Sequence, residues 1–160
     1  MDAIALLKSQ HRKVETLFSK IERANDHRGK QRLFSELADN LAGHATIEER
    51  HFYPAVRARQ TEDILLESLE EHLGIKRVIA DLLKLDAADD TYDAKITVLK
   101  EQVEHHVGEE EKDLFPKVKK LFDKADLETL GAAMQADFER LEAGHPADDV
   151  PSETDHAAPL

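Results

Sequence analysis

Apolar residues recur every three or four positions along most of the chain, and no strand-like alternation of useful length is present. This period places the apolar side chains on one face of a helix. Glycine, charge and capping signals divide the pattern into five predicted helices, at about residues 3–25, 30–57, 62–85, 92–122 and 127–142. Short turns at 26–29, 58–61 and 86–90 make neighbouring helices antiparallel. We therefore expect an all-α protein: an up-down-up-down antiparallel four-helix bundle with an additional C-terminal helix.

The length of 160 residues favours a single domain with a substantial core. We expect residues 1–143 to form it, from duplicated helical hairpins at about 3–58 and 62–122 and the fifth helix. The remaining segment, 144–160, holds three of the five prolines and almost no large apolar residue. That composition predicts a disordered tail.

Each predicted hairpin carries one copy of a short pattern. The first copy is HATIEERHFYP, from His44 to Pro54, and the second is HVGEEEKDLFP, from His106 to Pro116. In both, a glutamate follows the histidine by four residues, an aromatic by nine and a proline by ten. Residues four apart share a helix face, so each copy points an imidazole and a carboxylate the same way. The prolines should kink or end both helices at the same place relative to the pattern.

A further histidine precedes each copy at an almost equal distance, His11 by 33 residues and His72 by 34. Two residues of an antiparallel hairpin lie at the same height when the turn is midway between them. The sequence midpoints between successive histidines fall in or close to the three predicted turns, which were placed without reference to the histidines. An up-down bundle therefore puts all four histidines in one layer, with the two glutamates of the pattern one turn away.

The convergence of these six groups favours a metal site over an ordinary core. A lone histidine on an apolar stripe is more often a core residue than a ligand. Four histidines at one depth beside two carboxylates differ, because an unpaired buried charge is very costly and a metal cation compensates it. The candidate metal ligands are His11, His44, Glu48, His72, His106 and Glu110.

Composition narrows the choice of metal. The chain contains no cysteine, so any metal is bound through nitrogen and oxygen. Four imidazoles and two carboxylates suit iron, and less specifically manganese or zinc. The natural arrangement holds two ions, with the two histidines of each hairpin on one ion and both glutamates bridging.

The charge balance excludes two classes of partner. A net charge of −12, without any Lys/Arg cluster, argues against a nucleic acid or an anionic membrane. No apolar run approaches the length of a spanning helix, and the first residues lead into an amphipathic pattern and not into a signal peptide. A cytoplasmic protein, monomeric or weakly homodimeric, is the default expectation.

At the candidate ligands the chain resembles the hemerythrin-like family, whose cation-binding unit is called the HHE domain. The resemblance spans about residues 3–122 and rests on ligand order, spacing and duplication. The matching positions are His11, His44-x-x-x-Glu48, His72 and His106-x-x-x-Glu110, with Glu49, Tyr53-Pro54, Glu111 and Phe115-Pro116. The resemblance implies an up-down four-helix bundle around a non-haem di-iron centre, in which the six candidate residues hold two iron ions with a bridging oxo or hydroxo group.

Two positions depart from the oxygen-carrying members of that family. Those members have a fifth histidine one turn after the third-helix histidine, where this chain has Lys76. Their second bridging acid is an aspartate five residues after its histidine, where this chain has Glu110 at four. Two histidines on each iron leave both ions with an open position, which is more compatible with peroxide or nitric oxide chemistry, or with sensing, than with oxygen storage.

The leading interpretation is a di-iron protein that binds or reduces dioxygen, peroxide or nitric oxide, with catalase-like peroxide consumption as a candidate activity. The alternative is a metal- or redox-responsive sensor or interaction module without turnover. Near the site, His51 is expected to have a structural or supporting role. The glutamates beside the ligands are expected mostly on solvated faces; they are Glu49, Glu109 and Glu111. Three glycines indicate either tight helix contacts, which we favour, or a narrow path for a small molecule; they are Gly43, Gly74 and Gly108.

Overall fold

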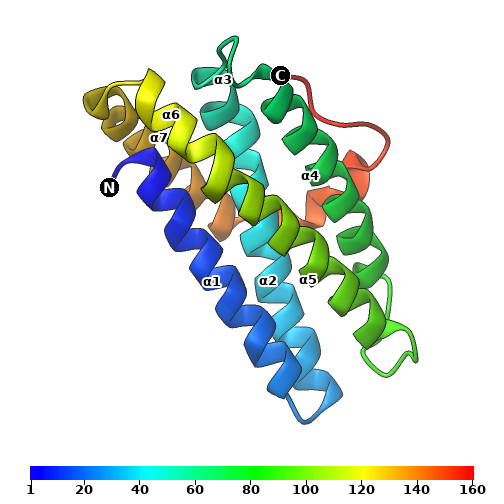
Figure 1. Cartoon of the computed structure of the whole chain (residues 1–160). Coiled ribbons are helices and arrows are strands. Elements are labelled where there is room, and N and C mark those ends of the chain that lie inside the picture. Colours follow the sequence, from blue (N-terminus) through cyan, green and yellow to red (C-terminus); the bar gives the residue numbers. More distant parts are fainter.

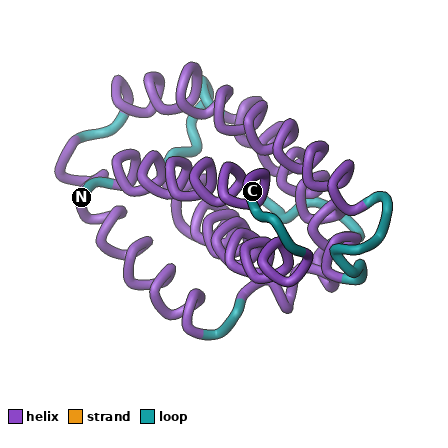
Figure 2. Tube along the Cα trace, turned by 90° about the horizontal axis from the view of Figure 1, so that it is seen from below, coloured by secondary structure: helices purple, strands orange, loops and turns teal.

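The computed structural model describes all of residues 1–160 and contains helices, turns and loops but no strand (Figure 2). Its four long helices are α1 (Ala3–Arg23), α2 (His27–Ile47), α4 (Glu62–Leu83) and α5 (Tyr92–Glu109). Figure 1 shows these helices running alternately in opposite directions, joined by short connections. The prediction of an all-α protein is therefore confirmed. No helix has the length and apolar character that crossing a membrane requires.

The first two helices begin where side chains cap them. Asp2 Oδ1 accepts a hydrogen bond from the Ala5 N–H at 2.8 Å, and Asp26 Oδ1 accepts one from the Gly29 N–H at 2.6 Å. These carboxylates satisfy backbone donors that have no partner inside the helix. The cap at Asp26 starts α2 three residues earlier than expected, so the predicted turn is shorter than its glycine suggested.

The apolar core consists of two clusters, one toward each end of the bundle. The cluster toward the α1–α2 and α4–α5 turns includes Phe18, Leu37 and Leu99. The cluster at the opposite end includes Phe52 and Phe115. Between the two clusters lies a layer of buried polar side chains, the candidate ligands among them. The apolar clusters exclude water from this layer on both sides.

Two turns of π-helix interrupt the second and fourth long helices directly after the duplicated histidines. They span Glu48–Phe52 and Glu110–Leu114, and the short helices α3 (Tyr53–Ala55) and α6 (Phe115–Leu121) follow them. A proline at the second position of each short helix cannot donate a backbone hydrogen bond, and its ring would clash with the carbonyl four residues earlier. The wider turn avoids that clash. The predicted disturbance at the two prolines is confirmed, and its form is a π turn, which is often found at functional sites.

The fifth long helix, α7 (Lys124–Ala143), packs against α1, α2 and the first π turn. A side chain at Gly131 would lie 2.5 Å from the Met1 carbonyl, so glycine there permits a close approach between α7 and the N-terminus. The helix thus covers the outer face of the first hairpin. It extends from 124 to 143, slightly beyond the predicted 127–142.

The expectation of a disordered tail is wrong for residues Pro146–Glu153, which form a 3-10 helix, η3. This segment packs against both α2 and α4, which contact each other at few positions. Ala147 and Val150 are buried and belong to the apolar cluster, and the Ala147 N–H donates to Asp39 Oδ1 at 3.1 Å. Small apolar side chains in the gap between α2 and α4, together with hydrogen bonds to Asp39 and from Arg77 to the Thr154 carbonyl, hold the segment in place.

Candidate metal centre

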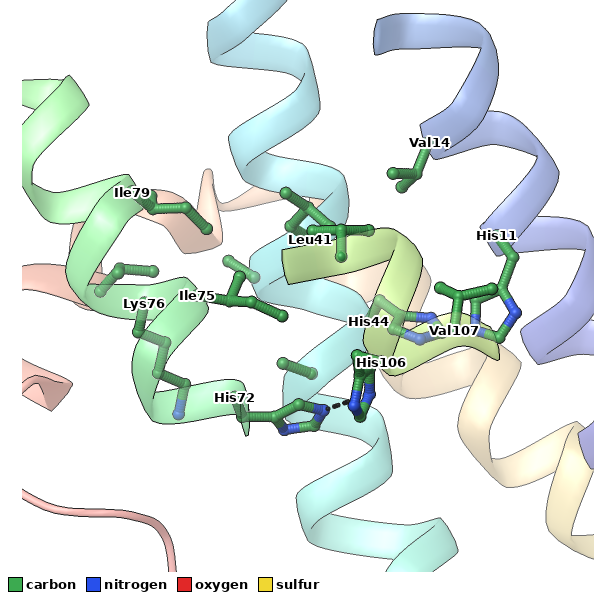
Figure 3. A pocket seen from close by; sticks show the side chains of 14 residues that line it. His11, Val14, Leu41, His44, His72, Ile75, Lys76, Ile79, His106 and Val107 are labelled. Carbon is green, nitrogen blue, oxygen red and sulfur yellow. Dashed lines mark hydrogen bonds between the residues drawn. The ribbon is translucent and has the colours of Figure 1, made fainter. Parts of the chain in front are cut away.

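The structure brings all six candidate ligands into the polar layer between the apolar clusters. Each of the four long helices contributes one histidine, and each π turn begins with one glutamate. All six are buried, and the two glutamates have no exposed surface. Figure 3 shows the four histidines of the layer converging from α1, α2, α4 and α5. The depth argument from the sequence agrees with this placement, and metal ligation by the six residues stays a prediction.

One cluster is formed by His11, His44, Glu48 and Glu110, whose ligand atoms lie within 4.8 Å of one another. His44 Nε2 lies 3.1 Å from Glu48 Oε1, and His11 Nε2 lies 3.3 Å from Glu110 Oε1. The two imidazole rings meet edge to face, with centroids 4.9 Å apart. Two imidazole nitrogens from the first hairpin thus face one carboxylate from each hairpin.

A second cluster is formed by Glu48, His72 and His106. The Nε2 atoms of the two histidines are 3.2 Å apart, and His72 Nε2 lies 3.0 Å from Glu48 Oε2. Glu48 therefore turns one oxygen to each cluster. Glu110 Oε1 lies 3.3 Å from His11 Nε2 and 3.4 Å from His106 Nε2. Glu48 is thus positioned to bridge two ions, Glu110 belongs to the first cluster and also lies beside His106 of the second, and the histidines divide between the clusters by hairpin.

The donor atoms fit a cation because several of them have no other partner. His11 Nε2, His44 Nε2, Glu48 Oε1 and Glu110 Oε1 are buried and make no hydrogen bond. Buried polar atoms are rarely left unpaired, since each loses its bonds to water without compensation. A cation between these atoms would satisfy them together. The clusters therefore fit a site for two metal ions held by nitrogen and oxygen.

Side chains behind the histidines orient three of the four rings. Gln10 Oε1 lies 2.7 Å from His44 Nδ1, Glu49 Oε2 lies 2.7 Å from His72 Nδ1, and Glu71 Oε1 lies 2.8 Å from His106 Nδ1. These acceptors favour a proton on Nδ1, which leaves the Nε2 lone pair directed at the centre. Around the fourth ring, Glu111 Oε1 approaches His11 Nδ1 at 3.8 Å.

The expectation that Glu49 lies on a solvated face is wrong. Its side chain is only 13% exposed, and it contacts both His72 and the Lys76 ammonium, at 3.1 Å. Glu111 is also partly covered, whereas Glu109 is more open and its carboxylate lies 3.1 Å from the exposed His105. The wider π turn brings the residue after Glu48 and the residue after Glu110 toward the neighbouring hairpin, which helical periodicity alone does not predict.

The electrostatics of the centre favour positive charge beside Glu48. Burial alone would raise the pKa of this carboxyl, but the charge of His44 and hydrogen bonds with the surrounding histidines outweigh burial and lower the pKa well below its usual value. Burial alone would lower the pKa of His106, but Glu110 and other carboxylates outweigh it and raise the pKa well above 6.5. The pKa of His72 is also raised, against burial, by carboxylate hydrogen bonds. Metal ions have to displace these protons, so binding is coupled to pH.

Tyr53 is a site residue to which sequence reasoning assigned no role. Its hydroxyl lies 3.1 Å from Glu48 Oε2, 3.0 Å from Glu110 Oε2 and 3.2 Å from His72 Nε2. Burial, followed by the charges of the two glutamates, raises the pKa of Tyr53 well above 10.0, so the hydroxyl keeps its proton as a donor. The aromatic position of the duplicated pattern was the available signal. Its second copy is Phe115, which has no hydroxyl and stacks on His11.

Lys76 and His51 lie outside the two ligand clusters. The Lys76 ammonium pairs with Glu49 and lies 3.7 Å from Glu153 in the C-terminal segment. His51 Nε2 lies 2.8 Å from Asp137 Oδ2 on α7, which agrees with the supporting role expected for it. Hydrogen bonds with His51 and the charge of Arg50 outweigh burial and lower the pKa of Asp137. These contacts link α7 to the first π turn.

The fold and the site together define a class of protein: a helical bundle that encloses a histidine and carboxylate centre for cations. The sequence model of the hemerythrin family, described as the hemerythrin HHE cation binding domain, matches residues 2–118. The chain belongs to this family, so the resemblance identified from the sequence is confirmed and the centre is a cation-binding one.

Two individual proteins are also similar to this chain. A hemerythrin HHE cation binding domain-containing protein of Mycobacterium kansasii, known from a crystal structure, is 28% identical and superposes with a TM-score of 0.80 over 90% of this chain and 89% of its own. A protein of Nostoc sp. named DNA nickase is 27% identical over 114 residues, which are 71% of this chain and 32% of that protein. The chain thus spans about a third of the length of this curated relative.

Proposed function

We propose that the chain is a non-haem di-iron protein that binds or reduces a small oxygen or nitrogen species, namely dioxygen, peroxide or nitric oxide. The observation that carries the proposal is Glu48, which turns one oxygen to each pair of histidines inside a buried centre. A carboxylate shared in this way suits two ions held close together. Iron is the metal that best combines imidazole and carboxylate ligands with redox chemistry.

A small cavity next to the histidines supports a ligand of two or three atoms. The cavity has a volume of about 30 Å³, and the four histidines form part of its wall (Figure 3). A water molecule needs roughly 10–15 Å³ by the same measure, so a diatomic molecule or a peroxide fits and an organic substrate does not. The rest of the wall is mainly apolar, with Val14, Leu41, Ile75 and Ile79 among its residues.

The residues present would hold two iron ions through two histidines each and the two bridging glutamates, with an oxo or hydroxo bridge between the ions. Bound iron would supply the electrons for reduction of a small molecule. The protein itself orients the imidazole rings, excludes water from the centre and supplies a proton. The acceptors behind His44, His72 and His106 fix the rings, and the apolar clusters exclude water. Tyr53 places a hydroxyl proton between the clusters, where a bound oxygen species could accept it.

Peroxide consumption of the catalase type is the activity that we expect to be fastest. With only two histidines for each ion, the residues present would leave room at both ions for a small molecule. A hydroxyl donor at Tyr53 favours turnover over storage, since it can transfer a proton to a reacting oxygen. Reversible oxygen storage gains less from such a donor.

A sensor or interaction role is the second candidate, and the contacts of α7 favour it. Asp137 on α7 joins His51 in the π turn that begins with Glu48. A change in metal occupancy at Glu48 could therefore move α7 without any turnover. A domain or partner in contact with α7 would then respond to that movement.

The test is reconstitution of the chain with ferrous iron under anaerobic conditions, followed by elemental analysis and stopped-flow spectroscopy. We expect about two iron ions per chain, as for other carboxylate-bridged bundles, and rapid spectral changes with peroxide, dioxygen or nitric oxide. The His44→Ala,His106→Ala double variant is the control and should retain less than half of the metal. A folded protein that binds no iron, or that binds it without reacting with any of the three molecules, would contradict the proposal.

A further inference from the structure

A groove between α1 and α5 leads from the surface toward the cavity beside the centre. It has a volume of about 450 Å³, and its walls include Phe18 and Ser19 from α1 and Lys100 and Gly108 from α5. The two helices are neighbours in the bundle but approach each other closely at few positions. The corresponding gap between α2 and α4 is filled by the C-terminal helix η3, whereas no segment fills this one.

The groove and the cavity share part of their walls. His11, Val14, Val103 and Val107 line both of them. These four side chains therefore form a wall that the groove and the cavity have in common. Val107 is the most exposed of the four, and rotation of this side chain would let a small molecule pass while His11 stays in place.

Gly108 lies at the groove beside Val107, and packing does not account for it. A Cβ atom at this position would meet nothing within 4 Å, whereas one at Gly43 would lie 3.0 Å from the Phe138 ring. The tight contact favoured from the sequence therefore explains Gly43 but not Gly108. Glycine costs a helix roughly 1 kcal/mol relative to alanine. What the missing side chain does provide is an unobstructed groove.

Both basic side chains at the rim are paired with carboxylates, which outnumber them, and the floor is mainly apolar. Arg12 binds both oxygens of Glu111, at 2.8 and 2.6 Å, and Lys100 binds Glu22 at 2.7 Å. The excess of carboxylates, with Glu15 and Glu104 also at the rim, disfavours anions. An apolar floor admits an uncharged molecule at much lower cost than an ion, which would lose its hydration. The groove therefore suits a small neutral molecule.

We propose that the α1–α5 groove is the route by which a small uncharged molecule reaches the cavity beside the centre, and that Gly108 keeps this route open. The proposal rests on the proposed function, since it assigns that function's ligand a path. A side chain larger than methyl at position 108 would cover the floor of the groove. It would slow passage in both directions without touching the ligands of the metal.

The experiment compares three variants of the full chain, loaded with iron and reduced, in stopped-flow binding of nitric oxide. Gly108→Leu should lower the association and dissociation rate constants together by about tenfold, equivalent to about 1.4 kcal/mol in each barrier. The dissociation constant should change less than about twofold, because a route affects both rates equally. Gly108→Ala is the size control and should bind at the wild-type rate, since an added Cβ meets nothing.

Gly74→Leu is the matched control for position. Gly74 lines a groove of about 370 Å³ on another face, with Glu71 and His105, and that groove shares no residue with the cavity. The association and dissociation rate constants of Gly74→Leu should therefore equal those of the wild type. Wild-type rates in Gly108→Leu, or equal slowing in Gly74→Leu, would overturn the proposed route.

A second measurement does not depend on iron. In the chain without metal and carrying Tyr92→Phe, Tyr53 is the only tyrosine, and dissolved dioxygen quenches its fluorescence on contact. Gly108→Leu should lower the quenching rate constant by about threefold, under 1 kcal/mol in barrier, and Gly74→Leu should leave it unchanged. If the wild-type centre binds no iron, or reacts with none of nitric oxide, dioxygen and peroxide, the proposed function fails. Quenching then decides the route alone, and an unchanged constant in Gly108→Leu contradicts it.

Discussion

The two halves of the metal centre share one skeleton and differ in the side chains around it. In both, a histidine and a glutamate four residues apart end a long helix in a π turn, and a proline follows. In the first half the aromatic of the pattern is Tyr53, whose hydroxyl lies between the clusters. In the second half it is Phe115, whose ring stacks on His11 with centroids 6.0 Å apart. One half therefore supplies a proton donor, and the other supplies an apolar wall.

The supporting side chains differ in charge as well. The residue before each upstream histidine accepts from the histidine of the pattern, and it is neutral Gln10 in the first hairpin but anionic Glu71 in the second. Glu49 adds a second carboxylate behind His72. An imidazole that donates to a carboxylate is a more basic ligand than one that donates to an amide. The comparison indicates that the two metal positions are unequal, with the more electron-rich one at His72 and His106.

The largest difference between the halves should come from their bridging glutamates. Glu48 contributes to both clusters, whereas Glu110 belongs to one of them. We expect Glu48→Gln to lose the rise in melting temperature that metal gives the wild type, a stabilisation of about 3–4 kcal/mol at a metal concentration 100 to 1,000 times the dissociation constant. Glu110→Gln should keep part of that rise.

Calorimetry with and without metal measures both variants. A stronger effect of Glu110→Gln than of Glu48→Gln would reverse the proposed inequality of the two carboxylates.

The next effect concerns the acceptors behind the histidines. Glu71→Gln gives the second hairpin the acceptor of the first, and we expect metal affinity at the His72 and His106 position to fall by about tenfold or more. Gln10→Glu makes the reverse change and should strengthen binding at the His11 and His44 position. Competition with a chelator of known affinity measures both variants. Unchanged metal affinity in Glu71→Gln would show that the charge difference between Gln10 and Glu71 does not make the two metal positions unequal.

A smaller effect should follow from exchanging the two aromatics. Tyr53→Phe removes the proton donor and should slow peroxide consumption by about tenfold, at the low end of what a positioned acid contributes. The free energy of unfolding should change by about 1 kcal/mol or less, since the loss amounts to hydrogen bonds of one hydroxyl. The double variant Tyr53→Phe,Phe115→Tyr completes the exchange, and recovery of the lost turnover would show that the donor works from either half. Peroxide turnover at constant metal content decides both.

The smallest effect is that of pH on the chain without metal. The pKa of Glu48 lies below 4.5, so its contribution to stability is present above that pH and is lost as pH falls through the lowered value. The pKa values of His72 and His106 lie above 6.5. Their contribution to stability is therefore present below pH 6.5 and is lost as pH rises through the raised values. Stability from these groups is greatest between 4.5 and 6.5.

Metal reverses the trend on the alkaline side, because its binding requires the imidazoles without their protons. The gain in melting temperature from metal should therefore increase as pH rises from about 6 to 8, the range in which histidine titrates. Melting curves across this range, with and without metal, give the gain. A gain that decreases with pH would contradict the raised pKa values.

The layer of candidate ligands could be predicted from the sequence because it depends on length alone. Equal helix lengths on either side of each turn bring His11 and His44, or His72 and His106, to one height whatever the packing. The positions of the outer carboxylates depend on rotation instead. Glu49 follows Glu48 by one residue, and a regular helix would turn it outward; the π turn brings it against His72.

Two other features of the structure could not be predicted from the hydrophobic periodicity of the sequence. The tail has few apolar residues, and composition predicted disorder, yet Ala147 and Val150 pack into a gap that α2 and α4 leave. Tyr53 and Phe115 occupy equivalent positions of the pattern, so only the direction of the hydroxyl in three dimensions assigns Tyr53 to the site. Both features require the coordinates of neighbouring helices.

The sharing of Glu48 has a consequence for how the chain is held together. With two ions bound, each hairpin would supply two imidazoles to its own ion, and a carboxylate from the other hairpin would join each set. The ions would then act as a buried cross-link between two helical pairs that are otherwise joined by apolar contacts, ion pairs such as Arg12–Glu111 and Lys100–Glu22, and a short covalent connection. That connection, between α3 and α4, contributes no ligand. The bundle is in this sense a dimer of hairpins within one chain, and metal can keep its halves associated even where the peptide link between them is cut.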